Sequence, residues 1–238
     1  MRHLSIAAIL FICSVAACAQ EKVLTESEFT EAVSRAEKAM FGGTHGPVRQ
    51  TMETEATTDG RPETDYHLLS VVEIVPGQGS HRIEDRSFGG KPSRTETITL
   101  GDRSFTRDAA GSWKETAAQP ASEGARAKTP ATAREWTDSQ AEYKYLGTET
   151  YADRQVQTYL KTERRKIVDA ATGATTESDV TAKVRIGTNG DYYRYESNSK
   201  NKFGDKTGSV KILIEVTADP TLKIAAPDVP KAVVKRSL

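Results

Sequence analysis

The sequence predicts an α+β protein in which antiparallel strands dominate. Apolar and polar side chains alternate through residues 180–187 and again through residues 210–216, and Asn189-Gly190 between them fits a type I′ turn. Several shorter runs of the same kind lie between residues 48 and 107, after one amphipathic helix. The sheet therefore has one wet face and one apolar face, and the apolar face must cover either a packed core or a lipid.

The predicted helix spans residues 24–41. Thr25 and Glu28 have the spacing of a capping box, and the pair Gly42-Gly43 is typical of a helix end. Apolar residues recur on one face at helical spacing, so we expect this face to pack on the sheet. The face consists of Leu24, Phe29, Val33, Ala36 and Met40.

A first group of strands is followed by a change in composition. Residues 116–134 are rich in Ala and contain Pro120, Gly124 and Pro130, which is typical of a linker. A short second helix is expected at residues 130–140 and would carry Trp136. The strands of this first group are expected at residues 48–57, 66–75, 80–87, 94–100 and 103–107.

The second group of strands begins at residues 142–147 and continues at residues 154–168. In the latter we expect Val156 and Leu160 to point inward and Tyr159 to point outward. Neither group has enough apolar residues to form a core alone, so residues 19–238 are predicted to form a single domain. The remaining segments are predicted as a polar turn at residues 169–179, a polar loop between residues 198 and 209, and a short edge element at residues 224–230.

The first 18 residues have the pattern of a signal peptide. A short basic start precedes an apolar run at residues 4–15, which is too short to span a bilayer. Val15-Ala16-Ala17-Cys18 resembles a bacterial lipobox, in which Cys18 becomes the lipid anchor; Ala17-Cys18-Ala19 is instead an ordinary A-x-A cleavage site. We favour the lipobox, and both alternatives predict an exported protein at the periplasmic face of the cell envelope.

The charge and the motifs indicate no chemistry. The 33 basic and 33 acidic residues cancel, which disfavours nucleic acid as a partner. His45, His67 and His81 lack metal-ligand spacing, so we predict no catalytic residue, no metal and no cofactor. The basic run at residues 161–166 is either a solvated hairpin end or a contact for anionic headgroups. Tyr192, Tyr193 and Tyr195 are either packed across strands or placed at a cavity rim.

The order of these elements resembles the LolA- and LolB-like periplasmic lipoprotein carriers and receptors, including LppX-like lipid-binding lipoproteins. The resemblance is carried by the strand pair at residues 147–160, the hairpin at residues 184–195 and the segment Ile224-Ala225-Ala226-Pro227. It implies a strongly curved antiparallel half-barrel with the N-terminal helix and the short second helix covering its concave face. It also implies a protein that binds acyl chains there without catalysing a reaction.

The function predicted from these observations is that of a lipid-anchored, non-enzymatic protein that binds lipid or an acylated lipoprotein in outer-membrane lipoprotein sorting or lipid transport. The alternative is a structural or protein-interaction domain of the envelope with a filled core, such as a partner of an envelope-stress sensor. The oligomeric state is not predicted. The candidate cavity residues are Phe29, Val33, Met40, Leu68, Val72, Ile74, Val156, Leu160, Val184, Ile186, Ile212 and Ile214.

Overall fold

The structure, a computed structural model, describes residues 21–41, 46–109, 111–117, 138–168 and 173–229. Its strands form one sheet of 12 antiparallel strands in the order β1-β8-β9-β10-β11-β12-β2-β3-β4-β5-β6-β7. Two meanders, β2–β7 and β8–β12, are joined because β12 pairs with β2. The strands are β1 (Lys22–Leu24), β2 (Val48–Thr58), β3 (Tyr66–Val75), β4 (Gly79–Phe88), β5 (Lys91–Leu100), β6 (Arg103–Asp108), β7 (Lys114–Ala117), β8 (Asp138–Tyr151), β9 (Arg154–Val168), β10 (Thr175–Gly187), β11 (Tyr192–Phe203) and β12 (Lys206–Ala218).

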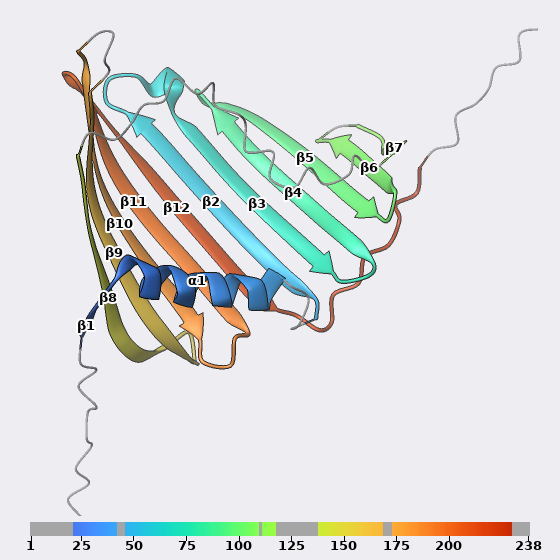
Figure 1. The fold of residues 1–238 in the computed structure, drawn as a ribbon. Helices are drawn as coiled ribbons and strands as arrows, with labels where there is room; N and C mark the ends of the chain where they lie inside the picture. The colour runs from blue at the N-terminus through green and yellow to red at the C-terminus, as the bar shows by residue number, and fades with distance from the viewer. Residues whose placement is uncertain (1–20, 42–45, 110, 118–137, 169–172, 230–238) are drawn as a thin grey trace, which may run out of the picture.

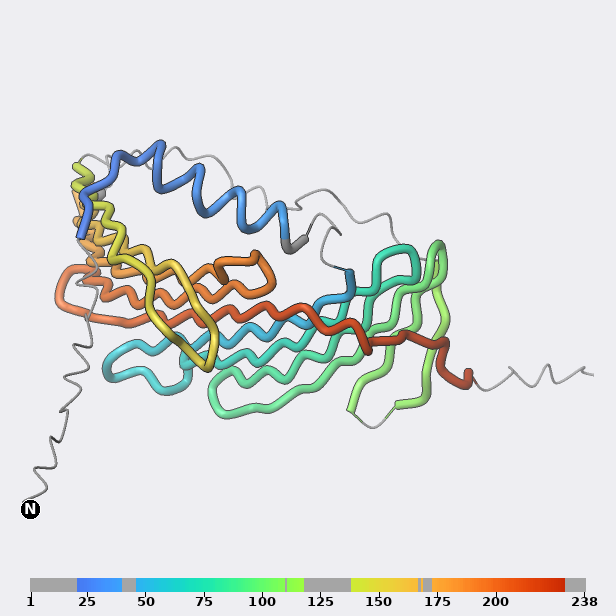
Figure 2. Tube along the Cα trace, turned by 90° about the horizontal axis from the view of Figure 1, so that it is seen from below, coloured from blue at the N-terminus to red at the C-terminus, as the bar shows by residue number. Residues whose placement is uncertain are grey.

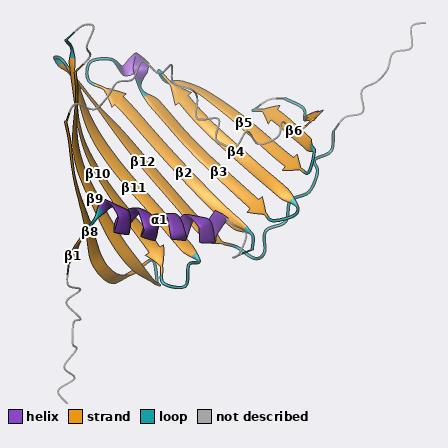
Figure 3. Ribbon diagram, viewed as in Figure 1, coloured by secondary structure: helices purple, strands orange, loops and turns teal. Residues whose placement is uncertain are grey.

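The sheet is strongly curved and open, with β1 and β7 at its two edges (Figure 1). Helix α1 (Glu26–Phe41) lies across the concave face, on the part formed by β8–β11 (Figures 1 and 2). A short 3-10 helix, Pro62–Thr64, joins β2 to β3, and strands make up nearly all of the remaining described structure (Figure 3). The predicted fold class, a curved, mostly antiparallel half-barrel with an N-terminal helix on its concave face, is confirmed.

Helix α1 begins as the sequence predicts. The Thr25 backbone N–H donates a hydrogen bond to Glu28 Oε2 at 2.8 Å, and the Glu28 N–H donates one to Thr25 Oγ1 at 3.2 Å. This reciprocal pair is a capping box. The hydrogen bonds that the Glu28 carboxylate accepts from the Thr25 N–H and from the Lys22 ammonium lower the pKa of Glu28 to about 2. The residues just before the cap form β1, which pairs with β8 and was not predicted.

The polar stretches of the second meander are strands, although the sequence predicts turns and loops there. β10 starts at Thr175, within the predicted turn at residues 169–179. β11 continues to Phe203 and β12 begins at Lys206, so the predicted polar loop is two paired strands joined at Gly204-Asp205. The ladder of backbone hydrogen bonds holds these residues whatever their side chains are, provided that the side chains reach solvent.

Several predicted boundaries are wrong. Residues 138–140 belong to β8, so the second helix does not extend to residue 140, and its residues 130–137 lie outside the described residues. Thr116 and Ala117 belong to β7, and the rest of the predicted linker at residues 116–134 also lies outside the described residues. The predicted edge element at residues 224–230 forms no strand through residue 229, the last described one.

The tight hairpin turn is found elsewhere than predicted. Asn189 does not have the positive φ that a type I′ turn at Asn189-Gly190 requires; only Gly190 of this pair does, at 77°. Ala152 and Asp153 have φ values of 47° and 62°, and they join Tyr151 directly to Arg154 across the β8–β9 hairpin. Two consecutive positive φ values in a two-residue hairpin are typical of a type I′ turn.

Candidate functional site

An aromatic cluster joins α1 to the concave face of the sheet. The Phe29 ring lies 5.0 Å from the Tyr143 ring and 6.4 Å from the Tyr159 ring, centroid to centroid, and meets the latter edge-on at 83°. Tyr145 adds a contact with Tyr159 at 5.2 Å. These separations suit tilted and edge-to-face aromatic pairs, so the N-terminal half of α1 is packed firmly on β8 and β9.

Further along α1 the contact with the sheet is made by smaller side chains. Ala36 is buried and Ala32 and Val33 are half-buried against the same core. The Tyr193 hydroxyl of β11 donates a hydrogen bond to Glu37 Oε1 at 3.2 Å. Burial and the adjacent Glu37 carboxylate raise the pKa of Tyr193, which keeps this hydroxyl protonated as a donor. The Tyr193–Glu37 bond therefore fastens the C-terminal half of the helix to the sheet.

Most of the predicted cavity residues lie on this concave face. Directly paired residues of neighbouring strands point to the same face of the sheet. The residues of β11, β12, β2 and β3 that share the concave face with Val184 can therefore be read from the strand register. The Met40 side chain lies outside the described residues. The residues placed together on α1 and on the concave face are Phe29, Val33, Leu68, Val72, Ile74, Val184, Ile186, Ile212 and Ile214.

Val156 and Leu160 lie on the opposite, convex face. Tyr159 faces α1, so its neighbours in the alternating strand β9 point away, and the prediction of the face of this strand was wrong. The prediction failed because β9 carries large apolar side chains on both of its faces, so alternation alone does not show which face is the inner one. Val156 is nonetheless fully buried, with an exposed fraction of 0%.

The convex face near Val156 carries a network of aromatic and charged side chains. The Tyr151 and Tyr192 rings stack at 6.3 Å, and the Arg185 guanidinium lies 4.2 Å from the centre of the Tyr151 ring. Arg185 pairs with Glu149 at 3.0 Å and with Glu196 at 2.7 Å. Burial raises the pKa of Tyr192 to about 12. This network covers Val156 and its neighbours on the convex side of the sheet, where no helix lies within the described residues.

The basic run at residues 161–166 is partly an internal ion network. The Glu163 side chain is only 8% exposed and pairs with Arg165 at 2.5 Å and Lys161 at 2.7 Å. Hydrogen bonds from Arg165 and the charge of Lys161 lower the pKa of Glu163 to about 2. Because these cations are already paired with Glu163, they are poor contacts for headgroups, whereas the exposed Arg164 pairs with Asp179 at 3.2 Å.

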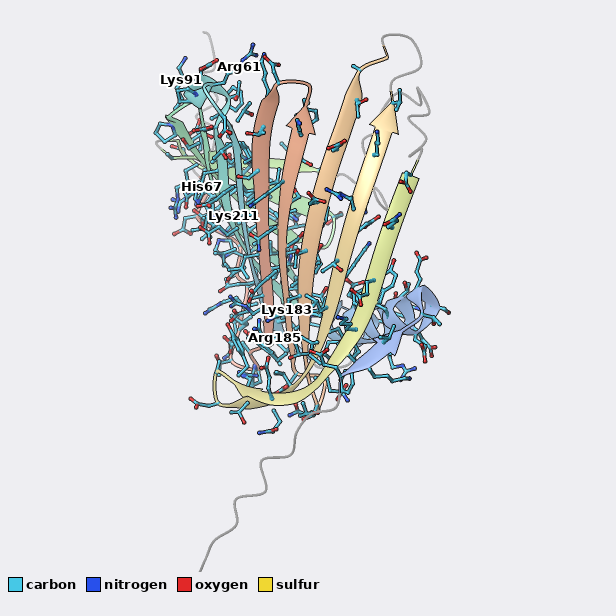
Figure 4. All side chains as sticks on the ribbon, turned by 90° about the vertical axis from the view of Figure 1, so that its left-hand side faces the viewer. Arg61, His67, Lys91, Lys183, Arg185 and Lys211 are labelled. Carbon is cyan, nitrogen blue, oxygen red and sulfur yellow. The ribbon has the colours of Figure 1, made fainter. Side chains whose placement is uncertain are left out.

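His67, on the convex face, lies beside two glutamates of the neighbouring strand that are not close to it in the sequence. His67 Nε2 lies 3.3 Å from Glu53 Oε1, and one donor atom from each of Glu53, Glu55 and His67 lies within 4.8 Å of the others. Among the described residues this group could hold a metal ion. Lys211, however, lies 3.7 Å from Glu55 and already supplies a positive charge there. His67 and Lys211 lie on the side of the sheet away from α1 (Figure 4).

Comparisons with known proteins give structural matches only. No family model matches the chain, and no curated protein matches it. Among solved structures, a LolA superfamily protein from Nitrosomonas europaea matches with 6% identity and a TM-score of 0.29, over 80% of this chain and 93% of the other. A structure described as an outer membrane lipoprotein-sorting protein domain, from Vibrio parahaemolyticus, matches with 11% identity and a TM-score of 0.26, over 81% of this chain and 93% of the other.

The fold that the sequence resemblance implies, an open curved sheet with a helix on its concave side, is confirmed by the sheet order and the position of α1. Within the part of the chain that the structure describes, no helix is long and apolar enough to cross a membrane. Residues 1–20, which include the predicted signal segment and Cys18, lie outside the described residues.

Proposed function

We propose that this protein binds a lipid or the acyl chains of a lipoprotein on the concave face of its sheet, without catalysing a reaction, and that α1 is a movable cover. The observation that carries the proposal is the way in which α1 is attached. Aromatic packing holds its first turns, whereas alanines and the Tyr193–Glu37 hydrogen bond hold its later turns. The helix can therefore swing about its N-terminal end.

The free energy gained by burying an acyl chain is comparable to the free energy lost when α1 leaves the sheet. Closing α1 buries Phe29, Ala36 and part of Val33, which contributes roughly 5 kcal/mol in apolar transfer. The Tyr193–Glu37 bond adds about 1 kcal/mol. An acyl chain that buries about ten methylenes gains roughly 8 kcal/mol at ~0.8 kcal/mol each. A bound chain can thus replace the contacts that the helix gives up.

The apolar surface continues beyond the helix. On β12, β2 and β3 the concave face carries the apolar side chains Ile212, Ile214, Met52, Leu68 and Val72, and the register places Gln50, Thr54 and Ser70 among them. α1 makes its closest approach to β8–β11 instead. Leu68 and Val72 are each 8% exposed, so a chain that entered between α1 and the sheet would have to displace the atoms that cover them.

The anchor completes the proposal. With a lipid on Cys18 the protein would be a stationary receptor or extractor at the periplasmic side of a membrane, and without it the protein would be a soluble shuttle. The Cys18→Ser variant tests this part. We expect it to leave the membrane fraction of the producing cells, and a variant that stays there would rule out anchoring through this residue.

A second candidate function is a structural or interaction domain with a filled core. The close aromatic packing of Phe29, Tyr143 and Tyr159 favours it, because these side chains already occupy the space below the first turns of α1. In that case α1 would stay closed and partners would bind elsewhere.

Ligand binding separates the two functions. Native mass spectrometry of the protein from its own membranes should show co-purified lipid, and the delipidated protein should bind a fluorescent fatty acid. Tyr193→Phe, which removes the hydrogen bond to Glu37, should speed probe association several-fold; Tyr195→Phe, on the same strand and face, is the matched control. An empty protein that takes up no probe in either form would exclude lipid binding and leave the filled-core domain.

A further inference from the structure

The concave face changes character between β3 and β4. The apolar positions of β3 are followed across one strand spacing by charged positions of β4 and then by hydroxyl side chains of β5. The register pairs Leu68 with Arg86, Ser70 with Glu84, and Val72 with Arg82. The concave face is therefore mainly apolar up to β3 and polar from β4 onward.

At this boundary two guanidinium groups share one carboxylate. Arg86 Nη2 lies 2.6 Å from Glu84 Oε2, and Arg82 Nη1 lies 3.6 Å from Glu84 Oε1. The Glu84 side chain is 14% exposed, whereas Arg82 and Arg86 are 56% and 51% exposed. The half-buried carboxylate orients both cations and neutralises one charge, which leaves a net positive charge facing solvent beside Val72 and Leu68.

The neighbouring strand adds hydrogen-bonding groups. On β5, Ser93 lies opposite Arg86, Thr95 opposite Glu84, and Thr97 opposite Arg82. The other charged residues on the concave face of β4–β7 are Lys91, Lys114 and Asp108, so basic residues outnumber acidic ones on this face. Lys91 lies at the end of the sheet away from α1 (Figure 4). Guanidinium groups flanked by hydroxyls match the oxygens of a carboxylate or a phosphate.

We propose that Arg82 and Arg86 bind the anionic headgroup of an amphiphile whose acyl chain lies on the apolar concave face of β3, β2 and β12. This inference rests on the proposed function, because the chain must occupy that face. Three strand spacings of ~4.8 Å separate β4 from β12, about 14 Å in total, which an extended acyl chain spans. The ligand class is thus an anionic lipid, recognised by its carboxylate or phosphate.

Three amphiphiles with the same alkyl chain test the site: a fatty acid, an alkyl phosphate and a fatty alcohol. Above the pKa of the fatty acid, we expect both anions to bind at least tenfold more tightly than the alcohol, with an affinity that falls as salt is added. The anion that binds more tightly identifies the headgroup. Inorganic phosphate, which has no chain, should compete only at far higher concentration.

The double variant Arg82→Gln/Arg86→Gln should lose at least tenfold in affinity for the anions and keep its affinity for the alcohol. The matched control is Arg94→Gln, an arginine on the convex face of β5 that pairs with Asp85 at 3.0 Å; it should bind all three ligands as the native protein does. Circular dichroism confirms that the variants are folded.

The outcomes distinguish this inference from the function on which it rests. Equal binding of anions and alcohol, or unchanged anion binding in the double variant, would overturn the headgroup site and leave acyl-chain binding intact. Failure of all three amphiphiles to bind the native protein would overturn both.

Discussion

The two parts of the sheet differ in the faces on which they bury side chains. In β8–β12, β2 and β3 the core that includes Tyr159, Val184 and Val216 lies on the concave side, and Val156 and Tyr192 are buried on the convex side as well. In β4–β7 the buried side chains Ile98 and Phe105 point to the convex side. The backbone ladder is continuous across both parts, so the choice of face depends on what covers it.

The cover differs in kind. Helix α1 lies over β8–β11 of the first part, whereas in the second part the Arg103 guanidinium lies 4.8 Å from the centre of the Phe105 ring and Arg107 lies 4.7 Å from that of Trp113. Long cationic side chains bury their stems on apolar surface and keep their charges in water. On the concave side of β4–β7 the side chains other than the exposed Phe88 carry hydroxyl groups or charges, and the headgroup site is proposed there.

The largest effect is expected at the contact between α1 and the sheet. Phe29→Ala should lower the free energy of unfolding by about 4 kcal/mol, because it removes a buried ring with two aromatic partners. Urea denaturation measures the change. The control is Phe88→Ala, a phenylalanine that is 60% exposed, for which we expect a change within about 0.5 kcal/mol. If both variants lost the same free energy of unfolding, the packing of Phe29 between α1 and the sheet would stabilise the protein no more than an exposed side chain does.

A somewhat smaller effect is expected in the part without a helix. Phe105→Ala should lower the free energy of unfolding by about 2–3 kcal/mol, because Phe105 is fully buried beneath the Arg103 side chain. Hydrogen exchange should show the loosening in β5–β7, while the amides of β10–β12 keep their protection. If protection fell equally throughout the sheet, the two parts would be one cooperative unit and the comparison would not hold.

The smallest expected effect on stability, that of the Glu163 ion network, is seen only at acidic pH. Hydrogen bonds from Arg165 lower the pKa of Glu163 from 4.5 to about 2 in the folded protein, so its ion network stabilises the protein above pH 4.5 and is lost as the pH falls toward 2. Glu163→Gln should flatten this part of the curve of stability against pH. Glu115→Gln is the control, because Glu115 pairs with Arg103 on the exposed convex face of β7, where solvent screens the pair. A native curve that is flat between pH 4.5 and 2 would contradict the buried network.

Part of the candidate site could be predicted from the sequence. Periodicity alone placed Phe29 and Val33 on the face of α1 that packs on the sheet, and it placed Leu68, Val72 and Ile214 on one face of their strands. It failed for Val156 and Leu160, because β9 has apolar side chains in both registers and Tyr159 was taken to point outward. The cluster of Glu53, Glu55 and His67 was missed for another reason: it is assembled across the paired strands β2 and β3. The ion network of Glu163, in contrast, is local, because Lys161, Glu163 and Arg165 alternate along β9 and share a face.

The sequence by itself determined the local features of this protein: the capped helix at its start, most of the strands, and the alternation that gives each strand two different faces. These depend on interactions among residues a few positions apart, which the order of side chains records directly. Only the tertiary structure decided that β12 pairs with β2, that polar segments such as residues 198–203 extend the ladder, and which face is buried in each part of the sheet. Those outcomes follow from contacts between distant segments, because a strand with apolar side chains on both faces is oriented by the element that covers it.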